Sequence, residues 1–218
     1  MTELLSGPAL APASGETAKQ LIIFLHGLGA DGRDLISLAP MFAEVFPDAR
    51  FVSPNAPFPC DMAPYGYQWF SMLTRNPAEM FAGIRRAEPF LNRFIDHELE
   101  TLGLEDKDLA LIGFSQGCMT ALHTSLRRNK PCAAVVGFSG GMLGLEALKD
   151  EIVSRPPVCL IHGTFDEVVP FAASEKTEKI LKELKVPVEF HPRPGLGHGI
   201  DPEGIEFAMD AIGRGFSR

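Results

Sequence analysis

The feature that most constrains this chain is an apolar run that leads directly into a Gly-x-Ser-x-Gly motif, at residues 108–117. The run has the length of a buried strand, and residues 118–128 favour a helix. In a strand–turn–helix of this kind, small residues two positions before and after Ser115 relieve a sharp turn that exposes the serine hydroxyl. The helix points its amino end at the same place, where it favours negative charge. Ser115 is therefore a candidate nucleophile.

A second match to the motif is centred on Ser139 and also follows an apolar run, residues 133–136. Three of the five residues after Ser139 are glycines, at 140, 141 and 144. These glycines delay the next helix and leave no fixed N–H groups beside the hydroxyl. We therefore expect Ser115 to be the nucleophile and keep Ser139 as the alternative.

Strand-length apolar runs alternate with helix-length segments along the rest of the chain. This alternation is typical of βαβ units, and it predicts an α/β fold with a mostly parallel sheet covered by helices on both faces. No repeat or linker interrupts it, so residues 1–218 are expected to form a single domain. The expected strands are residues 21–25, 50–53, 108–112, 133–138, 158–162 and 186–191, with 4–10 an edge strand at best. The expected helices are 33–46, with a kink or a late start at Pro40, and 77–102, 118–128, 145–153, 171–184 and 202–216. Residues 54–67 contain four prolines and are expected to form a long ordered loop.

Composition narrows the class of partner. The net charge is −8 and Lys and Arg do not cluster, which argues against nucleic acid. No basic amino-terminal region precedes an apolar segment, and no run approaches the ~18 residues of a membrane span, so we expect a cytoplasmic protein without integral membrane association. The four cysteines lack zinc or redox spacing, and no ligand set for a metal or nucleotide cofactor appears. A soluble small molecule or an acylated molecule is the expected substrate.

Polar residues follow the carboxyl ends of the expected strands, where parallel sheets bind their ligands. Asp166 comes shortly after strand 158–162, and His198 lies between two glycines after strand 186–191. The chain order Ser, Asp, His is that of α/β-hydrolases, in which the imidazole takes the serine proton and the carboxylate orients the imidazole. With Ser115 as nucleophile, one strand separates its strand from the one that precedes the acid, as that fold requires; with Ser139 that strand would be missing.

Each of these residues also has a structural interpretation. Asp166 could cap the following helix, with Glu167 as the acid in its place. His198 could be an ordinary loop histidine, although the other histidines fall in strand ends, helices or the first turn. His26 is expected to shape the turn after the first buried strand rather than to transfer protons.

The chain as a whole resembles the carboxylesterase, lysophospholipase and acyl-protein thioesterase family of small α/β-hydrolases. The resemblance covers nearly the whole chain and rests on FLHGLGADG (24–32), QWF (68–70), GFSQG (113–117), HGTFDEVVP (162–170) and GHG (197–199). It implies the α/β-hydrolase fold and a triad of Ser115, Asp166 and His198. It also implies an oxyanion hole formed by the backbone N–H groups of Leu28 and Gln116. Ser71 stands where the family often has Asp, which leaves the leaving-group preference open.

The resemblance implies two-step hydrolysis of an ester or thioester through an acyl-serine intermediate. A lysophospholipase is the alternative within this chemistry, a non-catalytic binding protein of the same fold is the alternative outside it, and a homodimer is possible. The acyl chain would need an apolar groove, and large apolar side chains beside the strand ends could supply one, although they could equally be core or loop packing. The groove candidates are Trp69, Phe70, Met72, Leu73 and Phe171.

Overall fold

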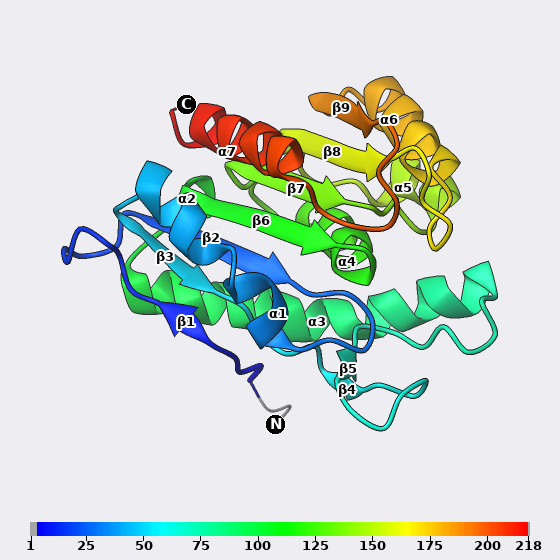
Figure 1. Cartoon of the computed structure of the whole chain (residues 1–218), viewed down its shortest axis with the longest axis horizontal. Helices are drawn as coiled ribbons and strands as arrows, with labels where there is room; N and C mark the ends of the chain where they lie inside the picture. The colour runs from blue at the N-terminus through cyan, green and yellow to red at the C-terminus, as the bar shows by residue number, and fades with distance from the viewer. Residues whose placement is uncertain (1–3, 218) are drawn as a thin grey trace.

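A seven-stranded sheet organises the structure, a computed structural model that describes residues 4–217 (Figure 1). Its strands lie in the order β1-β3-β2-β6-β7-β8-β9. Every neighbouring pair is parallel except β1 with β3, so the mostly parallel sheet predicted from the alternating pattern is confirmed. The strands are β1 (Ala9–Leu10), β2 (Gln20–Leu25), β3 (Ala49–Val52), β6 (Leu109–Phe114), β7 (Ala134–Phe138), β8 (Val158–Gly163) and β9 (Val188–Arg193).

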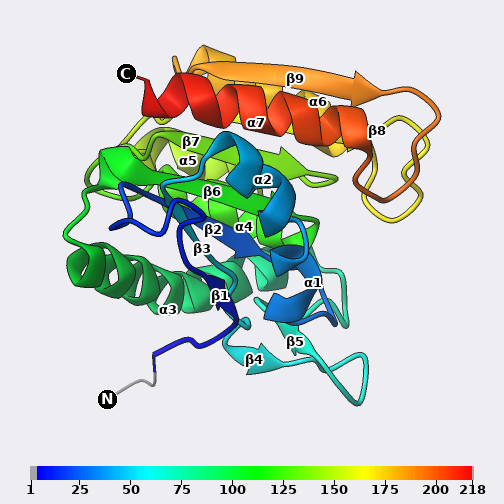
Figure 2. The ribbon, with the colours of Figure 1, turned by 60° about the vertical axis from the view of Figure 1, so that its left-hand side comes forward.

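Helices cover both faces of this sheet (Figure 2). Successive side chains of a strand point to opposite faces, and each face has its own apolar cluster: Ile23 packs in one and Phe24 in the other. The Phe24 cluster includes residues of α1 (Gly32–Ile36), α2 (Ala39–Val45) and α7 (Pro202–Phe216). The Ile23 cluster, on the other face, includes residues of α3 (Pro77–Leu102), α4 (Gln116–Ser125), α5 (Leu145–Glu151) and α6 (Ala172–Glu183). A short 3₁₀ turn, Asp106–Asp108, precedes β6.

The helix expected at residues 33–46 is divided into α1 and α2, and Pro40 lies in the first turn of α2. Proline has no N–H group to donate to the preceding turn, but it is tolerated at a helix start, so the chain restarts there. The long helix α3 matches its predicted bounds. The Asn76 side chain accepts hydrogen bonds from the backbone at its start, and Gly103 ends it with φ of 67°.

The observed strands differ from the expected ones at the start of β9 and in the segment before α3. Strand β9 begins at Val188 rather than at residue 186, because Pro187 has no N–H group; its carbonyl instead accepts from Val158. The proline-rich segment expected to be a loop contains a small hairpin of β4 (Phe58–Pro59) and β5 (Tyr67–Gln68).

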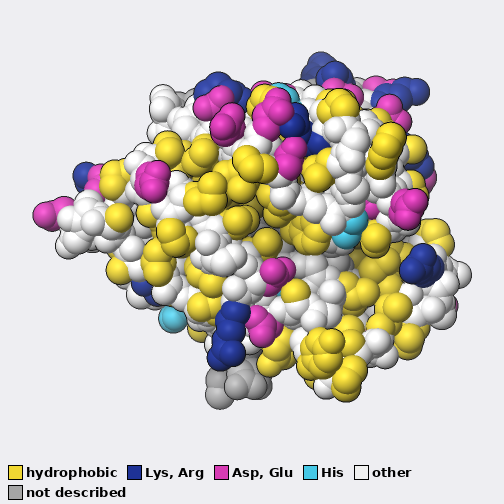
Figure 3. Space-filling model, viewed as in Figure 1, with side chains coloured by type: hydrophobic (Ala, Val, Ile, Leu, Met, Phe, Trp, Pro, Cys, Tyr) yellow, Lys and Arg dark blue, Asp and Glu magenta, His cyan; other side chains and the backbone are white. Residues whose placement is uncertain are grey.

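The carboxyl ends of β2, β6, β7 and β8 lie at one end of the sheet, because these neighbouring strands are parallel. Figure 1 shows the arrowheads of β6, β7 and β8 at the right of the sheet. In Figure 3 hydrophobic side chains gather on that side of the molecule, with a histidine among them. Phe165 and Val168 are exposed apolar residues of the loop after β8, and Met62 and Leu73 are exposed apolar residues of the segments on either side of β5.

Candidate active site

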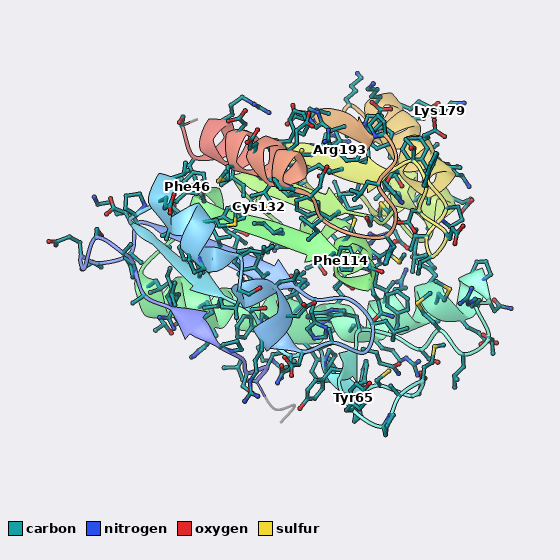
Figure 4. All side chains as sticks on the ribbon, in the orientation of Figure 1. Phe46, Tyr65, Phe114, Cys132, Lys179 and Arg193 are labelled. Atoms are coloured by element: carbon teal, nitrogen blue, oxygen red, sulfur yellow. The ribbon has the colours of Figure 1, made fainter. Side chains whose placement is uncertain are left out.

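Ser115 lies at a strained turn between β6 and α4. Its φ of 54° and ψ of −116° are unusual for a non-glycine residue, and α4 begins at the next residue. Two glycines make the turn possible: a Cβ on Gly113 would lie 2.3 Å from the Gly117 carbonyl oxygen, and one on Gly117 would lie 1.9 Å from that of Leu25. The local geometry is that of a nucleophile elbow. Figure 4 labels Phe114, the last residue of β6, immediately before this turn.

Ser139 occupies a similar turn at the end of β7, with φ of 47°. Ser139 as a whole is 1% exposed, and its hydroxyl donates to the carbonyl oxygen of Gly199 at 3.2 Å. The next helix begins only at Leu145, as the glycines after this serine predict. The Ser139 hydroxyl is therefore engaged in holding the loop that carries His198.

Asp166 and His198 lie together although 32 residues separate them in the chain. His198 Nδ1 is 2.7 Å from Asp166 Oδ2, and the other carboxylate oxygen accepts from the backbone N–H groups of Val168 and Val169. Burial alone raises the pKa of Asp166, but the hydrogen bonds from His198, Val169 and Val168 outweigh it and hold that pKa below its ordinary value. The carboxylate therefore stays ionised at neutral pH beside the imidazole.

One pocket of about 310 Å³ brings Ser115 and His198 together with Leu28. The ring of Phe114 lies 4.8 Å from the His198 ring, which places the imidazole beside the elbow. Asp166 is buried behind His198. The pocket is lined by Gly27, Leu28, Ala30, Asp34, Met62, Met72, Arg75, Phe114, Ser115, Val168, Val169 and His198.

Hydrogen bonds from neighbouring segments hold the loop that carries Leu28 in place. His26 is fully buried; its Nε2 accepts from the Ala56 N–H at 3.0 Å, and its Nδ1 lies 2.7 Å from the Gly27 carbonyl oxygen. Burial lowers the pKa of His26, so the ring is uncharged at neutral pH. These contacts agree with the expectation that His26 shapes the turn. The backbone of Gly29 also donates to Tyr67 of β5, so the hairpin missed in the sequence supports this loop.

The five groove candidates occupy different places in the structure, and only one of them lines the pocket. Met72 lines the pocket, but Trp69 and Phe70 are 0% and 1% exposed and pack in the core, which corrects the expectation that they form the groove. Leu73 is exposed outside the pocket lining, and Phe171 packs against the rings of His162 and Phe190 instead.

The side chain of Gln116 explains why Trp69 and Phe70 are buried. Its Oε1 accepts from the Trp69 N–H at 2.8 Å, and its Nε2 donates to the Phe70 carbonyl oxygen at 2.7 Å. The residue after the nucleophile thus ties this segment to the elbow. Sequence reasoning assigned only the Gln116 backbone a role, and nothing in the residue pattern indicated the partner of its amide. A side-chain amide that bridges an N–H group and a carbonyl in this way imitates strand pairing.

Cys118, close to the nucleophile, is buried, and burial raises the pKa of its thiol to about 12. It is a packing residue beside the nucleophile. Within residues 4–217, one group of metal-type ligands lies elsewhere: Cys159, Glu189 and His191 have ligand atoms within 4.8 Å of one another, although Arg214 already pairs with Glu189. No helix in that range is long and apolar enough to cross a membrane.

Comparison with known proteins gives a consistent result. Residues 10–214 match the profile of the phospholipase/carboxylesterase family. The chain is 30% identical to acyl-protein thioesterase 1 of Schizosaccharomyces pombe, covering 98% of this chain and 99% of that protein, and 28% identical to esterase YpfH of Escherichia coli, covering 89% and 82%. The crystal structure of esterase PE8 superposes with a TM-score of 0.92 at 43% identity, covering 95% of this chain and 97% of that one.

Proposed function

The chain belongs to the phospholipase/carboxylesterase family of hydrolases, and we propose that it cleaves carboxylic esters or thioesters through an acyl-serine intermediate. The observation that carries this proposal is the placement of Ser115, at a strained turn, in one pocket with His198, whose Nδ1 is bonded to the ionised Asp166. Relatives named as esterases and as acyl-protein thioesterases support both ester and thioester substrates.

In the first step the Ser115 hydroxyl oxygen attacks the substrate carbonyl carbon, and its proton passes to Nε2 of His198. Asp166 accepts from Nδ1, which fixes the ring so that Nε2 is free to act as the base. The carbonyl oxygen becomes an oxyanion, which we assign to the backbone N–H groups of Leu28 and Gln116. Gln116 is the first residue of α4, so its N–H group has no partner in the preceding turn and the helix dipole adds to its effect.

The oxyanion then collapses, the bond to the leaving alcohol or thiol breaks, and His198 returns its proton to the departing atom. A water molecule then attacks the acyl carbon while His198 takes its proton, and a second oxyanion forms at the same N–H groups. The bond from the acyl carbon to the Ser115 oxygen breaks, His198 returns the proton to that oxygen, and the carboxylic acid is released. Each step uses the same three groups in reversed roles. The apolar side chains of Leu28, Met62 and Met72 give the pocket the lining that an acyl chain requires.

The test is pre-steady-state hydrolysis of p-nitrophenyl acetate. We expect a burst of p-nitrophenol equal to the enzyme concentration, and mass spectrometry of the quenched enzyme should place the acetyl group on the peptide that contains Ser115. Ser115→Ala should lose the burst and at least about 10⁴-fold in kcat, because Ser115 supplies the one hydroxyl among the side chains that line the pocket with His198.

Ser139→Ala is the matched control, since it removes a hydroxyl from the same kind of turn one strand away. It should keep the burst. Activity retained by Ser115→Ala, or an acetyl group found on Ser139, would contradict the proposal. Paired oxygen esters and thioesters of increasing acyl length would then establish which bond and which chain length the pocket prefers.

We also propose that the enzyme works in the cytoplasm. The four cysteines are unpaired, and Cys60 is partly exposed, which suits a reducing compartment. Subcellular fractionation tests this location, and recovery of the protein from an oxidising compartment would contradict it.

A further inference from the structure

His162 is a second buried imidazole in contact with Asp166. It is the penultimate residue of β8, four positions before the aspartate, and its side chain is 0% exposed. It does not line the pocket that contains Ser115, so it cannot touch a substrate bound there. One edge of the ring meets Phe171, with ring centroids 5.7 Å apart.

The partners of His162 require a proton on Nε2. This atom lies 3.0 Å from Asp166 Oδ2 and 3.0 Å from the Val169 carbonyl oxygen, and both of these oxygens can only accept. Nδ1 lies 2.7 Å from the Ser174 hydroxyl, which in turn contacts the Gly140 carbonyl oxygen. The Ser174 hydroxyl can either donate to Nδ1 or accept from it. In both cases Nε2 of His162 carries a proton and donates to Asp166.

With His162 included, every acceptor site of the Asp166 carboxylate is used. Oδ1 accepts from the N–H groups of Val168 and Val169 at 2.8 and 2.9 Å. Oδ2 accepts from His198 at 2.7 Å and from His162 at 3.0 Å. A carboxylate offers about four lone-pair sites, so this buried group is saturated with donors. His198 is one of those donors, and His162 competes with it for the same oxygen.

We propose that His162 is a positioning residue that holds the Asp166 carboxylate in place and limits how strongly it stabilises the protonated form of His198. The inference rests on the proposed triad of Ser115, Asp166 and His198. A donor to Oδ2 draws on the negative charge that would otherwise act on His198 alone. It also keeps the carboxylate oriented while the His198 ring gains and loses its proton. His198 can therefore return its proton to the departing oxygen or sulfur atom in each half-reaction.

Other charged groups lie in the same pocket or on the segments beside it. Asp34 of α1 and Arg75 line the same pocket. Glu167, beside Asp166, is exposed. Arg193 of β9 is held by ion pairs with Asp201 and Glu203. Ser174 and Phe171, which face His162 from the start of α6, carry no charge.

The test compares His162→Leu, which removes the donor, with His162→Gln, whose amide N–H can occupy the place of Nε2. Both are assayed as the full chain for kcat, KM and the pH dependence of kcat/KM on a p-nitrophenyl ester. In His162→Leu we expect kcat to fall roughly 10- to 100-fold with little change in KM. The acid limb of the profile should move up by about half a pH unit or more, because a more basic His198 loses its proton at higher pH. His162→Gln should return both values toward the wild type.

His162→Asn provides a second test in case the Leu variant fails to fold. Its shorter amide can still reach Ser174 but not Asp166, so it should show the raised acid limb while His162→Gln does not. The matched control is His123→Leu. His123 is also fully buried and lies 3.1 Å from a carboxylate, that of Glu88, but it is away from the pocket, so its loss should leave the acid limb unchanged.

Equal acid limbs in the Asn and Gln variants, or a wild-type acid limb in a folded Leu variant, would overturn the role of His162. Those results would leave the proposed function intact as long as Ser115→Ala is inactive. Activity in Ser115→Ala would instead overturn the proposed function itself.

Discussion

The two Gly-x-Ser-x-Gly turns share their local geometry and differ in their surroundings. Ser115 and Ser139 end adjacent parallel strands, and both have positive φ. Each donates its backbone N–H to the next strand over, Ser115 to Phe138 and Ser139 to Ile161, both at 2.9 Å. Only the first turn leads directly into a helix and opens into the pocket with His198.

The difference teaches that the motif specifies a strained turn and not a nucleophile. Reactivity needs a base that faces the hydroxyl and N–H groups that face the developing charge. Around Ser139 the hydroxyl is buried and already bonded to Gly199. The same local fold therefore serves the site at one strand end and its support at the next. Three predictions test this contrast.

Of these three, the largest effect is expected from Asp166→Asn, because the acid acts through His198 on the first turn only. The amide cannot accept from Nδ1 in the same way and favours the wrong tautomer of the imidazole, so kcat should fall about 10³- to 10⁴-fold. Steady-state kinetics on a p-nitrophenyl ester measure this. Glu167→Gln is the matched control, since this neighbouring exposed carboxylate was the alternative acid, and it should remain active. The reverse result would exchange the two assignments.

The next effect compares the glycines that precede the two serines. A Cβ on Gly113 would strike the Gly117 carbonyl oxygen, which is backbone, whereas a Cβ on Gly137 would lie 2.5 Å from the Cys118 sulfur, a side chain. We expect Gly113→Ala to cost about 3 kcal/mol or more in unfolding free energy and Gly137→Ala about 1–3 kcal/mol.

Denaturant unfolding measures both variants. Adding Cys118→Ala should recover much of the loss in Gly137→Ala, because it removes the sulfur that the new methyl group meets. The same addition should not rescue Gly113→Ala. Equal rescue of the two would show that the first turn is no more tightly constrained than the second.

The smallest effect is expected from Ser139→Ala. It removes one hydrogen bond to Gly199 and should lower the unfolding free energy by about 1 kcal/mol. Because Gly199 follows His198, kcat should fall by less than about tenfold, through looser placement of the loop. Urea unfolding and steady-state kinetics check the two values. A loss in kcat as large as that of Ser115→Ala would remove the contrast between the turns.

Much of the fold could be predicted from local pattern. Helix α3 has its predicted bounds because Asn76 and Gly103 cap its two ends through contacts with residues only a few positions away in the chain. The division of the helix at Pro40 was predicted only as a kink or late start, since the outcome depends on packing. The β4–β5 hairpin was missed, because two-residue strands carry no recognisable period.

The site shows the same division. The approach of Asp166 to His198 followed from their places after neighbouring strands, since parallel strands end at a common edge. The burial of Trp69 and Phe70 did not follow, because it depends on a hydrogen-bonded bridge from Gln116, 46 or more residues away. The second contact of Asp166, to His162, was also not visible in the pattern, because it depends on how the His162 ring is oriented at the end of β8 and on the fold of the loop that carries Asp166.

By itself the sequence determined the alternation of strands and helices, the two glycine-relieved turns and the order of the serine, acid and base, because these depend on the preferences of residues close together in the chain. Only the tertiary structure decided which turn faces an imidazole, which aromatic side chains are core and how many donors the buried carboxylate of Asp166 receives. Those properties depend on distances between side chains from separate segments, and packing sets such distances only when the whole sheet and its helices are assembled.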